Sequence, residues 1–110
     1  MNIKNIDMFL TIKKFSKLTF NQDFQVDVIT LYKIKKNMKK IDEAYRPCDE
    51  AIQEILKTKN ADNEKDIEAK INTLMQEKVD VDIEKIKISA FDGAKSSFDF
   101  IDAIYIMIED

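Results

Sequence analysis

The feature that most constrains the fold is a run of apolar residues in the middle of the chain, at alternating spacings of three and four. The run consists of Leu31, Ile34, Met38, Ile41, Tyr45, Cys48, Ile52 and Ile55. On a helix, this spacing brings every member onto one stripe, as in a heptad seam. We therefore predict one helix over residues 31–55, with a continuous apolar face that needs a packing partner.

The only proline of the chain, Pro47, lies within this seam. Proline removes one intrahelical hydrogen bond and clashes with the preceding turn, which costs about 3 kcal/mol in a helix interior. The seam nevertheless keeps its phase across Pro47, and a loop of arbitrary length would usually lose that register. The sequence therefore predicts one long helix that bends here, with Tyr45 and Cys48 packed at the bend. Packing in the core or at an interface is expected for every tyrosine, because all lie in apolar stripes: Tyr32, Tyr45 and Tyr105.

A second helical pattern can fill the seam. Residues 63–78, NEKDIEAKINTLMQEK, place these apolar side chains on one face: Ile67, Ile71, Leu74 and Met75. The preceding TKNADN has the composition of a helix-to-helix turn, and Asp62 or Asn63 is expected to cap the returning helix. We predict an antiparallel helical hairpin within one chain. The alternative is an intermolecular coiled coil, in which the same seam forms a homo-oligomer.

Both ends of the chain carry further apolar helical patterns. Residues 5–18 leave only a narrow polar side with Lys13, Lys14 and Lys17, so this helix must be largely buried. Residues 19–25 read as a connection. A last helix is predicted over residues 97–109, because Ser96 and Asp99 match a capping box and the residues after them are apolar on every side. A strand over 103–108 is the rival prediction, since Ile and Tyr favour β structure.

Between these helices, residues 79–90 have the alternation of a β-strand. Apolar residues share one parity from Val79 to Ile83 and the opposite parity at Ile86 and Ile88. The change of phase predicts a bulge or a short turn. Because a lone strand cannot satisfy its backbone, the two halves pair as a small hairpin or find other strands. The predicted fold class is mainly α with a minor β element.

These elements also predict how the chain is arranged. The returning helix is shorter than the long one and leaves the first half of the seam uncovered. The two terminal helices are the large apolar surfaces that remain, so we predict that they close over this half and form a compact base. The acidic hairpin then projects from the base at an angle set by Pro47. One domain is expected over residues 1–110, because a chain of 110 residues builds a single modest core.

Composition narrows the classes of protein further. One glycine among 110 residues argues against an all-β fold with many tight turns and against a glycine-rich phosphate loop. A single cysteine cannot form an intrachain disulfide, and the first residues lack a secretory pattern, so a cytoplasmic location is expected. The longest nearly apolar run, residues 101–108, contains Asp102 and is far shorter than the roughly 20 residues of a membrane span. No membrane partner is expected.

Residues suited to catalysis are scarce. The chain has no histidine, which removes the commonest general base and the commonest metal ligand. Cys48 lies on the seam and is expected to be a small core residue. Asp80, Asp82 and Glu84 share one face of the predicted strand, and paired acids can bind a divalent ion, but an exposed strand face has the same pattern. We therefore predict no enzymatic activity, no metal site and no cofactor.

Charge is distributed unevenly along the chain. Residues 1–40 carry nine lysines and three acidic residues, a balance of +6; residues 41–110 carry nine basic and eighteen acidic residues, a balance of −9. A lysine cluster on the long helix has the spacing to hold phosphates of a nucleic acid, although a solvated helix face is the simpler interpretation. The cluster consists of Lys33, Lys35, Lys36, Lys39 and Lys40. The acidic candidates for contact with a partner follow on the same helix: Asp42, Glu43, Asp49, Glu50 and Glu54.

The stretch LYKIKKNMKKIDEAYRPCDEAIQEI carries Tyr32, Lys36, Asn37 and Ile41, followed by an acidic helix. It resembles a family of small phage and prophage proteins of Gram-positive bacteria, a domain family of unknown function; Pro47 departs from the helix-favouring residues expected there. The resemblance implies a viral or mobile-element origin and no particular functional residue.

Together with the scarce catalytic chemistry and the apolar terminal helices, this leads to the expectation of a helical protein-binding module with a protein partner. Such a module would inhibit a host protein complex, for example one of host defence, or serve as a phage accessory or assembly factor. The alternative is a nucleic-acid-binding accessory protein that uses the basic face of the long helix.

Overall fold

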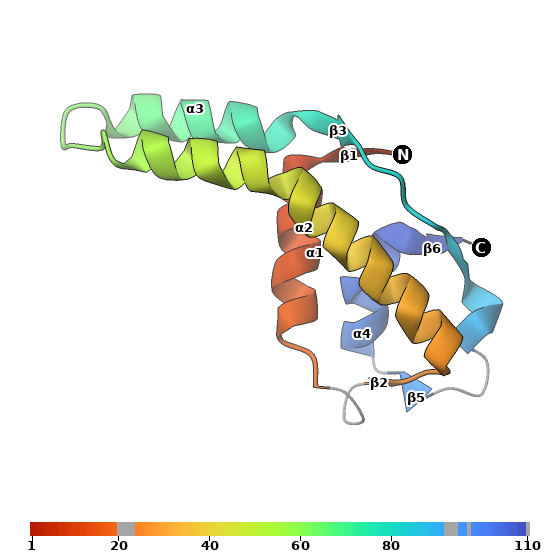
Figure 1. Ribbon diagram of the computed structural model, residues 1–110. Helices are drawn as coiled ribbons and strands as arrows, with labels where there is room; N and C mark the ends of the chain where they lie inside the picture. The colour runs from red at the N-terminus through yellow and green to blue at the C-terminus, as the bar shows by residue number, and fades with distance from the viewer. Residues whose placement is uncertain (20–23, 92–94, 97, 110) are drawn as a thin grey trace.

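The structure is a computed structural model that describes residues 1–19, 24–91, 95–96 and 98–109. Two long helices form a hairpin that projects from a more compact base, and the molecule measures 55 × 27 × 19 Å (Figure 1). The hairpin consists of α3 (Glu64–Gln76) and the second half of α2 (Val28–Leu56). The base consists of the first half of α2, α1 (Asn5–Ser16) and α4 (Phe98–Ala103). This is the predicted fold class, mainly α with small strand pairs.

Helix α2 continues through Pro47 as one helix, as the phase of the seam predicts. It changes direction near its middle, where the hairpin leaves the base (Figure 1). The helix begins a turn earlier than the seam does, because Asp27 caps its N-terminus. The Asp27 carboxylate accepts hydrogen bonds from the backbone N–H and the hydroxyl of Thr30, each at 2.8 Å. These bonds, the backbone bond foremost, hold the pKa of Asp27 below its ordinary value.

The two helices of the hairpin are antiparallel and belong to one chain, which confirms the predicted antiparallel hairpin. The seam of α2 packs against α3 of the same chain. Ile52 and Ile67 are its most buried apolar side chains away from the bend. Asn63 occupies the capping position of α3, but its side chain does not cap the helix. Its amide instead closes the turn, accepting from the backbone N–H of Asn60 at 2.7 Å and donating to the Thr58 carbonyl at 2.8 Å.

The core lies in the base, where α1 and α4 pack against each other and α1 packs against α2. Phe91 meets Phe100 edge-on, with ring centroids 5.8 Å apart. The prediction that both terminal helices close over the first half of α2 is therefore confirmed for the N-terminal helix, whereas α4 packs mainly against α1, and Met107 beyond α4 reaches Asn37 of α2 at 3.5 Å. The largest side chains with almost no exposed surface are Met8, Ile34, Asn37, Ile41, Phe100, Ile104 and Met107.

Short strands tie the ends of the chain to its middle. The strand β1 (Asn2–Lys4) pairs antiparallel with β3 (Lys78–Asp80), and β4 (Ile86–Lys87) pairs parallel with β6 (Ile108–Glu109). Residues 78–87, which we call the crossing segment, therefore meet one terminal segment at each end. Residues 79–90 were predicted either to form a small hairpin or to pair with other strands. The hairpin is wrong, because β3 pairs with β1 and β4 pairs with β6. A further antiparallel pair joins β2 (Phe24–Gln25) to β5 (Lys95–Ser96).

The predicted last helix over 97–109 is too long. Helix α4 ends at Ala103, and Tyr105–Met107 form a 3₁₀ turn before β6. The parallel pairing with β4 satisfies backbone groups of Ile108 and Glu109, and the β-branched Ile108 favours the extended form. The expected capping box involves the side chain of Ser96, which lies outside the described residues. Of the predicted connection at 19–25, residues 20–23 also lie outside them, and the remainder includes β2.

Candidate functional site

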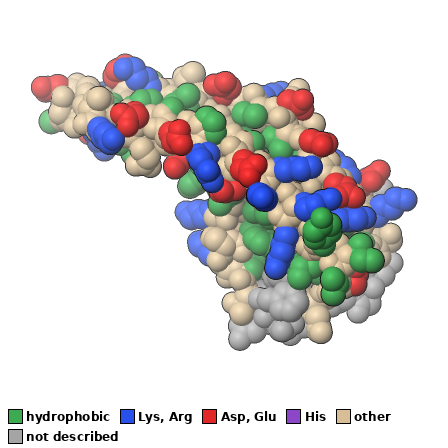
Figure 2. Space-filling model, in the orientation of Figure 1, with side chains coloured by type: hydrophobic (Ala, Val, Ile, Leu, Met, Phe, Trp, Pro, Cys, Tyr) green, Lys and Arg blue, Asp and Glu red, His purple; other side chains and the backbone are tan. Residues whose placement is uncertain are grey.

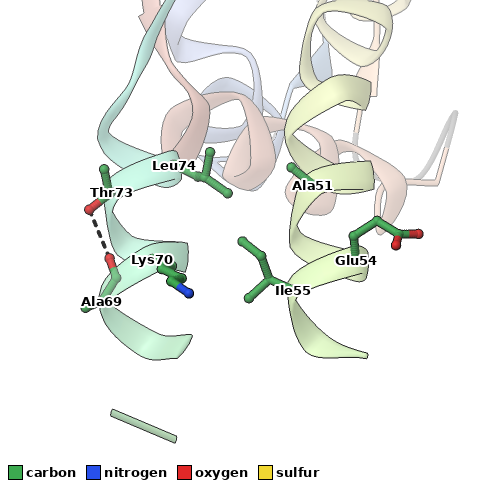
Figure 3. A pocket seen from close by; sticks show the side chains of 7 residues that line it. All are labelled: Ala51, Glu54, Ile55, Ala69, Lys70, Thr73 and Leu74. Atoms are coloured by element: carbon green, nitrogen blue, oxygen red, sulfur yellow. Dashed lines mark hydrogen bonds between the residues drawn. The ribbon is translucent and has the colours of Figure 1, made fainter. Parts of the chain in front are cut away.

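The hairpin carries an open apolar groove between its two helices. In Figure 3, Ile55 and Ala51 of α2 face Leu74 and Lys70 of α3 across this space, which has a volume of about 580 Å³. The Thr73 hydroxyl is turned back to the Ala69 carbonyl, to which it donates at 3.0 Å. We call this surface the hairpin groove. Its lining residues are Ala51, Glu54, Ile55, Ala69, Lys70, Thr73 and Leu74.

Small side chains on α2 keep this side of the hairpin hollow. Ala44, Pro47 and Ala51 follow helical spacing, so they lie on one face of α2. A second hollow of about 290 Å³ adjoins them at the bend, and it shares Ala51 and Leu74 with the hairpin groove. The groove therefore continues along one side of the hairpin from α3 to the bend at Pro47.

Buried polar groups lie at this bend. The Asn5 side chain donates to the Leu74 carbonyl at 2.8 Å, and the Asn5 backbone N–H donates to the Glu77 carbonyl at 2.9 Å. These bonds fix the start of α1 to the end of α3, while the side-chain oxygen of Asn5 is buried without a hydrogen-bond partner. Cys48 is buried as predicted, and burial raises the pKa of its thiol. Burial also raises the pKa of Tyr45, whose ring centroid lies 5.9 Å from that of Phe9.

The hairpin surface is acidic. Residues 42–77 carry ten acidic and five basic side chains, a balance of −5. The acidic residues singled out from the sequence all lie exposed on α2. Asp42 pairs with Arg46 at 3.4 Å, and Glu54 pairs with Lys57 at 2.9 Å. The other candidates make no ion pair with any residue that the structure describes: Glu43, Asp49 and Glu50.

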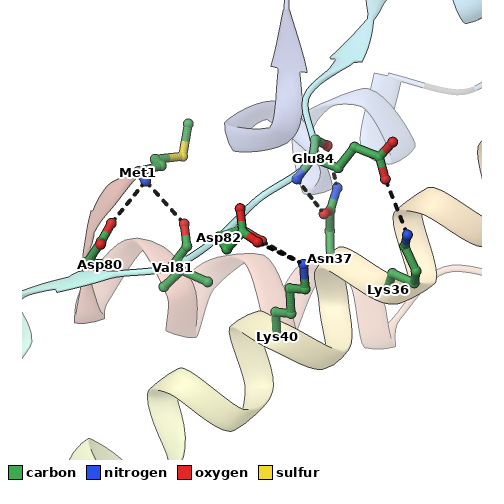
Figure 4. Close-up of polar contacts among 8 residues, drawn as sticks. All are labelled: Met1, Lys36, Asn37, Lys40, Asp80, Val81, Asp82 and Glu84. Carbon is green, nitrogen blue, oxygen red and sulfur yellow. Dashed lines mark hydrogen bonds and ion pairs between the residues drawn. The ribbon is translucent and has the colours of Figure 1, made fainter.

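Three of the five lysines in the predicted basic cluster face carboxylates of the crossing segment. Lys36 approaches Glu84 at 3.4 Å and Lys40 approaches Asp82 at 3.5 Å (Figure 4). Lys33 approaches Glu84 at 3.8 Å. Lys35 and Lys39 are exposed and have no ion pair within the described ranges. The cluster is therefore partly neutralised by the fold itself.

Asn37 holds the crossing segment to α2 beneath these lysines. Its buried amide donates to the Glu84 carbonyl at 2.8 Å and accepts from the Glu84 backbone N–H at 3.0 Å (Figure 4). Both polar groups of one residue in an irregular segment are thus satisfied by a single side chain. Sequence analysis missed this role of Asn37, although a polar residue beside an apolar seam is a recognisable signal.

The acidic residues of the crossing segment each face a different basic group, so they do not converge on one point. Asp80 lies 3.1 Å from the amino group of Met1, whereas Asp82 and Glu84 face lysines of α2. In the described parts of the chain, no group of three or more Cys, Asp or Glu side chains is placed to hold a metal ion. None of the helices there combines the length and apolar character that a bilayer crossing requires.

Apolar side chains are exposed at the start of α2. Val28 is 82 % exposed, Ile29 70 % and Tyr32 62 %. Figure 2 shows hydrophobic side chains at the surface over this end of α2, beside lysines. We call Val28, Ile29 and Tyr32 the apolar patch. Sequence analysis missed it, because Val28 and Ile29 lay between the predicted connection at 19–25 and the helix expected to begin at residue 31.

Each tyrosine was expected to pack in the core or at an interface, and the structure places one of them, Tyr45, in the core. Tyr45 is buried on the seam, but Tyr32 and Tyr105 are largely exposed and do not belong to the core. Both residues lie off the seam. The Lys36 ammonium lies 5.0 Å from the Tyr32 ring centroid, which is within range of a cation–π contact.

Comparison of the chain with known protein families, with characterised proteins and with solved structures finds no match. The resemblance to small phage proteins therefore rests on the residues that suggested it. In the structure these residues have different surroundings: Asn37 and Ile41 are buried, whereas Tyr32 and Lys36 lie on the outer face of α2.

Proposed function

We propose that this protein is a non-enzymatic protein-binding module, and that its hairpin groove binds an apolar helix of a partner protein. The observation that carries the proposal is the open groove of about 580 Å³ on a hairpin that projects away from the core. The groove lies on the hairpin, which projects away from the base (Figure 1), so the groove contributes little to holding the base together.

The shape and chemistry of the groove suit a third helix. Apolar residues of an incoming helix at spacings of three and four contact Ile55 and Leu74, as in other helix-in-groove complexes. The small side chains Ala51 and Ala69 let the incoming backbone approach closely, which shortens the distance between helix axes. The acidic surroundings favour a partner helix with basic residues beside its apolar stripe.

The biological setting is part of the same proposal. The resemblance to phage and prophage proteins supports a role as an inhibitor of a host protein complex or as a phage accessory or assembly factor. In either role the helix bound by the groove belongs to the host complex or to the phage assembly. The absence of histidine and the protonated, buried thiol of Cys48 support binding rather than catalysis.

Affinity capture with matched variants tests the proposal. Ala51→Arg fills the groove, whereas Gln53→Arg makes the same charge change two residues away, at an exposed position of α2 that does not line the groove. We expect the wild type and Gln53→Arg to retain the same stoichiometric partner from cells, and Ala51→Arg to lose it. Equal recovery with all three proteins, or no stoichiometric partner with any of them, contradicts the proposal.

Nucleic-acid binding by the basic face is the alternative function, and the exposed Lys35 and Lys39 favour it. With two uncompensated lysines, the slope of log K against log salt on duplex DNA is expected to be about −2, rather than the roughly −4.5 of five phosphate contacts. The measurement is a salt titration of DNA binding with the wild type and a Lys35→Gln, Lys39→Gln variant. Binding that is absent at low salt, or unchanged in the variant, excludes this function.

A further inference from the structure

We propose that a second copy of this chain is one occupant of the hairpin groove, and that it docks through the apolar patch at the start of its α2. This inference rests on the proposed function, because it names an occupant for the same groove. The contact joins the base of one copy to the hairpin of the next.

The apolar patch has the spacing of a docking helix. Val28, Ile29 and Tyr32 stand at positions i, i+1 and i+4, so they share one face over about one turn. Helices that bind in grooves present anchors at such spacings. The patch is the surface of α2 that α1, α3 and the crossing segment leave open, and exposed clusters of large apolar side chains mark interaction sites.

The charges of the two surfaces are complementary. Lys35 and Lys39 continue the stripe of Tyr32 at spacings of three and four, and both are exposed without an ion pair among the described residues. The hairpin has ten acidic against five basic side chains, and Glu50 and Glu54 lie on α2 beside the groove. A helix whose apolar anchors enter the groove therefore brings two free ammonium groups toward Glu50, which has no ion pair among the described residues, and Glu54, which also pairs with Lys57.

The patch and the groove cannot meet within one copy. They lie in the first and last turns of the same helix, which holds them about 35 Å apart at 1.5 Å per residue. Figure 1 shows the start of α2 in the base and its end in the projecting hairpin. The contact is therefore between copies and joins two unlike surfaces, so the association is head to tail. A small interface of this kind is transient, and we expect a Kd on the order of 100 µM.

Sedimentation velocity over about 10 µM to about 1 mM tests the contact with two matched pairs of variants. Tyr32→Glu disrupts the patch, and Tyr105→Glu makes the same change at another exposed tyrosine. Ala51→Arg fills the groove, and Gln53→Arg is its control. We expect the wild type and both controls to associate with rising concentration, and Tyr32→Glu and Ala51→Arg to lose at least about tenfold in affinity. If circular dichroism shows either variant unfolded, Ile29→Glu and Thr73→Arg replace it.

Mixing the two defective variants decides between a specific contact and general stickiness. Tyr32→Glu keeps its groove and Ala51→Arg keeps its patch, so their equimolar mixture forms a 1:1 complex and grows no further. A wild type that stays monomeric at about 1 mM, or a mixture that forms no complex, overturns the inference. Neither result affects the proposed function, which depends on whether the Ala51→Arg protein loses a different partner in affinity capture.

Discussion

The base and the hairpin share one long helix, yet they are stabilised differently. In the base, Ile34 and Ile41 of α2 are both 0 % exposed, because helices and the crossing segment surround them. In the hairpin, α2 has α3 as its neighbour, and apolar residues such as Ile55 of α2 and Leu74 of α3 are only partly buried. The comparison leads us to expect that the fold depends mainly on the base, whereas the hairpin has an open apolar side.

The largest effect is expected from truncating the centre of the base. Phe100 is 0 % exposed and packs edge-on against Phe91, so Phe100→Ala leaves a large cavity. We expect a loss of about 3–5 kcal/mol in the free energy of unfolding. This is a large part of the roughly 5–15 kcal/mol that stabilises a typical domain. Urea unfolding followed by circular dichroism measures the change.

The matched substitution in the hairpin is Ile67→Ala. Ile67 is 3 % exposed, but it lies in a two-helix contact that can open or collapse locally, so a loss of about 2 kcal/mol is expected, the low end for such truncations. A loss for Ile67→Ala equal to or above that for Phe100→Ala would show that the hairpin stabilises the fold as much as the base does.

An intermediate effect is expected where the crossing segment meets α2. Asn37→Ala removes both partners of the Glu84 backbone groups in a buried site, so the free energy of unfolding should fall by about 2–3 kcal/mol. Asn37→Asp is the sharper variant, because a carboxylate still accepts from the Glu84 N–H but turns an acceptor toward its carbonyl. Thermal unfolding of both variants provides the measurement, and a change below about 0.5 kcal/mol for both would remove Asn37 from this role.

A smaller effect of opposite sign is expected at the boundary between the two regions. Pro47→Ala restores a backbone N–H to α2 and removes the clash with the preceding turn, so the fold should remain and gain about 1–2 kcal/mol. The angle of the hairpin should change, and with it the affinity for any occupant of the groove. Chemical unfolding measures the change in stability, and small-angle X-ray scattering measures the change in the angle of the hairpin. A Pro47→Ala protein that fails to fold contradicts this account of the bend.

The smallest effect is expected at the start of α2, and it depends on pH. The bonds from Thr30 lower the pKa of Asp27 in the folded protein, so the Asp27 carboxylate stabilises the fold above its ordinary pKa. This contribution is lost as pH falls through the lowered folded pKa. Asp27→Ala should therefore lower the melting temperature slightly at about pH 7 and hardly at all at about pH 2. Asp27→Asn, which keeps the cap, serves as the control. A difference in melting temperature between wild type and Asp27→Ala that grows as pH falls would contradict the predicted pH dependence.

Much of the helical architecture could be predicted from the sequence, because it follows from local periodicity. The seam from Leu31 to Ile55 predicts the long helix, its continuity through Pro47 and its pairing with the returning helix. The same pattern leaves an uncovered first half, from which the base follows. These features depend on spacing along one segment and on simple complementarity between segments.

The strand pairs could not be predicted, because each joins residues far apart in the chain. Nothing in the local pattern of Ile86 and Lys87 indicates that Ile108 and Glu109 complete their backbone bonds. The same holds for β1, whose partner β3 lies at the start of the crossing segment. Since short strands carry weak patterns, the last helix was predicted to extend through residues that the structure places in a strand.

The candidate site was predictable only as a charge pattern. The acidic face of α2 follows from spacing, and so does the lysine cluster. The pairing of Lys33, Lys36 and Lys40 with the crossing segment depends on tertiary placement, which the sequence does not reveal. The groove was invisible for the same reason, because it depends on how small side chains such as Ala51 and Ala69 lie across two helices.

Amide hydrogen exchange of the free wild-type protein tests the central contrast most directly. The account predicts that amides of α2 around Ile34 and Ile41 exchange only by global unfolding, whereas amides of α3 and of α2 beyond Ala51 exchange through a local opening of lower free energy. Exchange followed by nuclear magnetic resonance, across denaturant concentrations below the unfolding transition, distinguishes the two regimes. Equal opening free energies with the same denaturant dependence in both regions would show one cooperative unit and contradict the separation of a stabilising base from a projecting, binding hairpin.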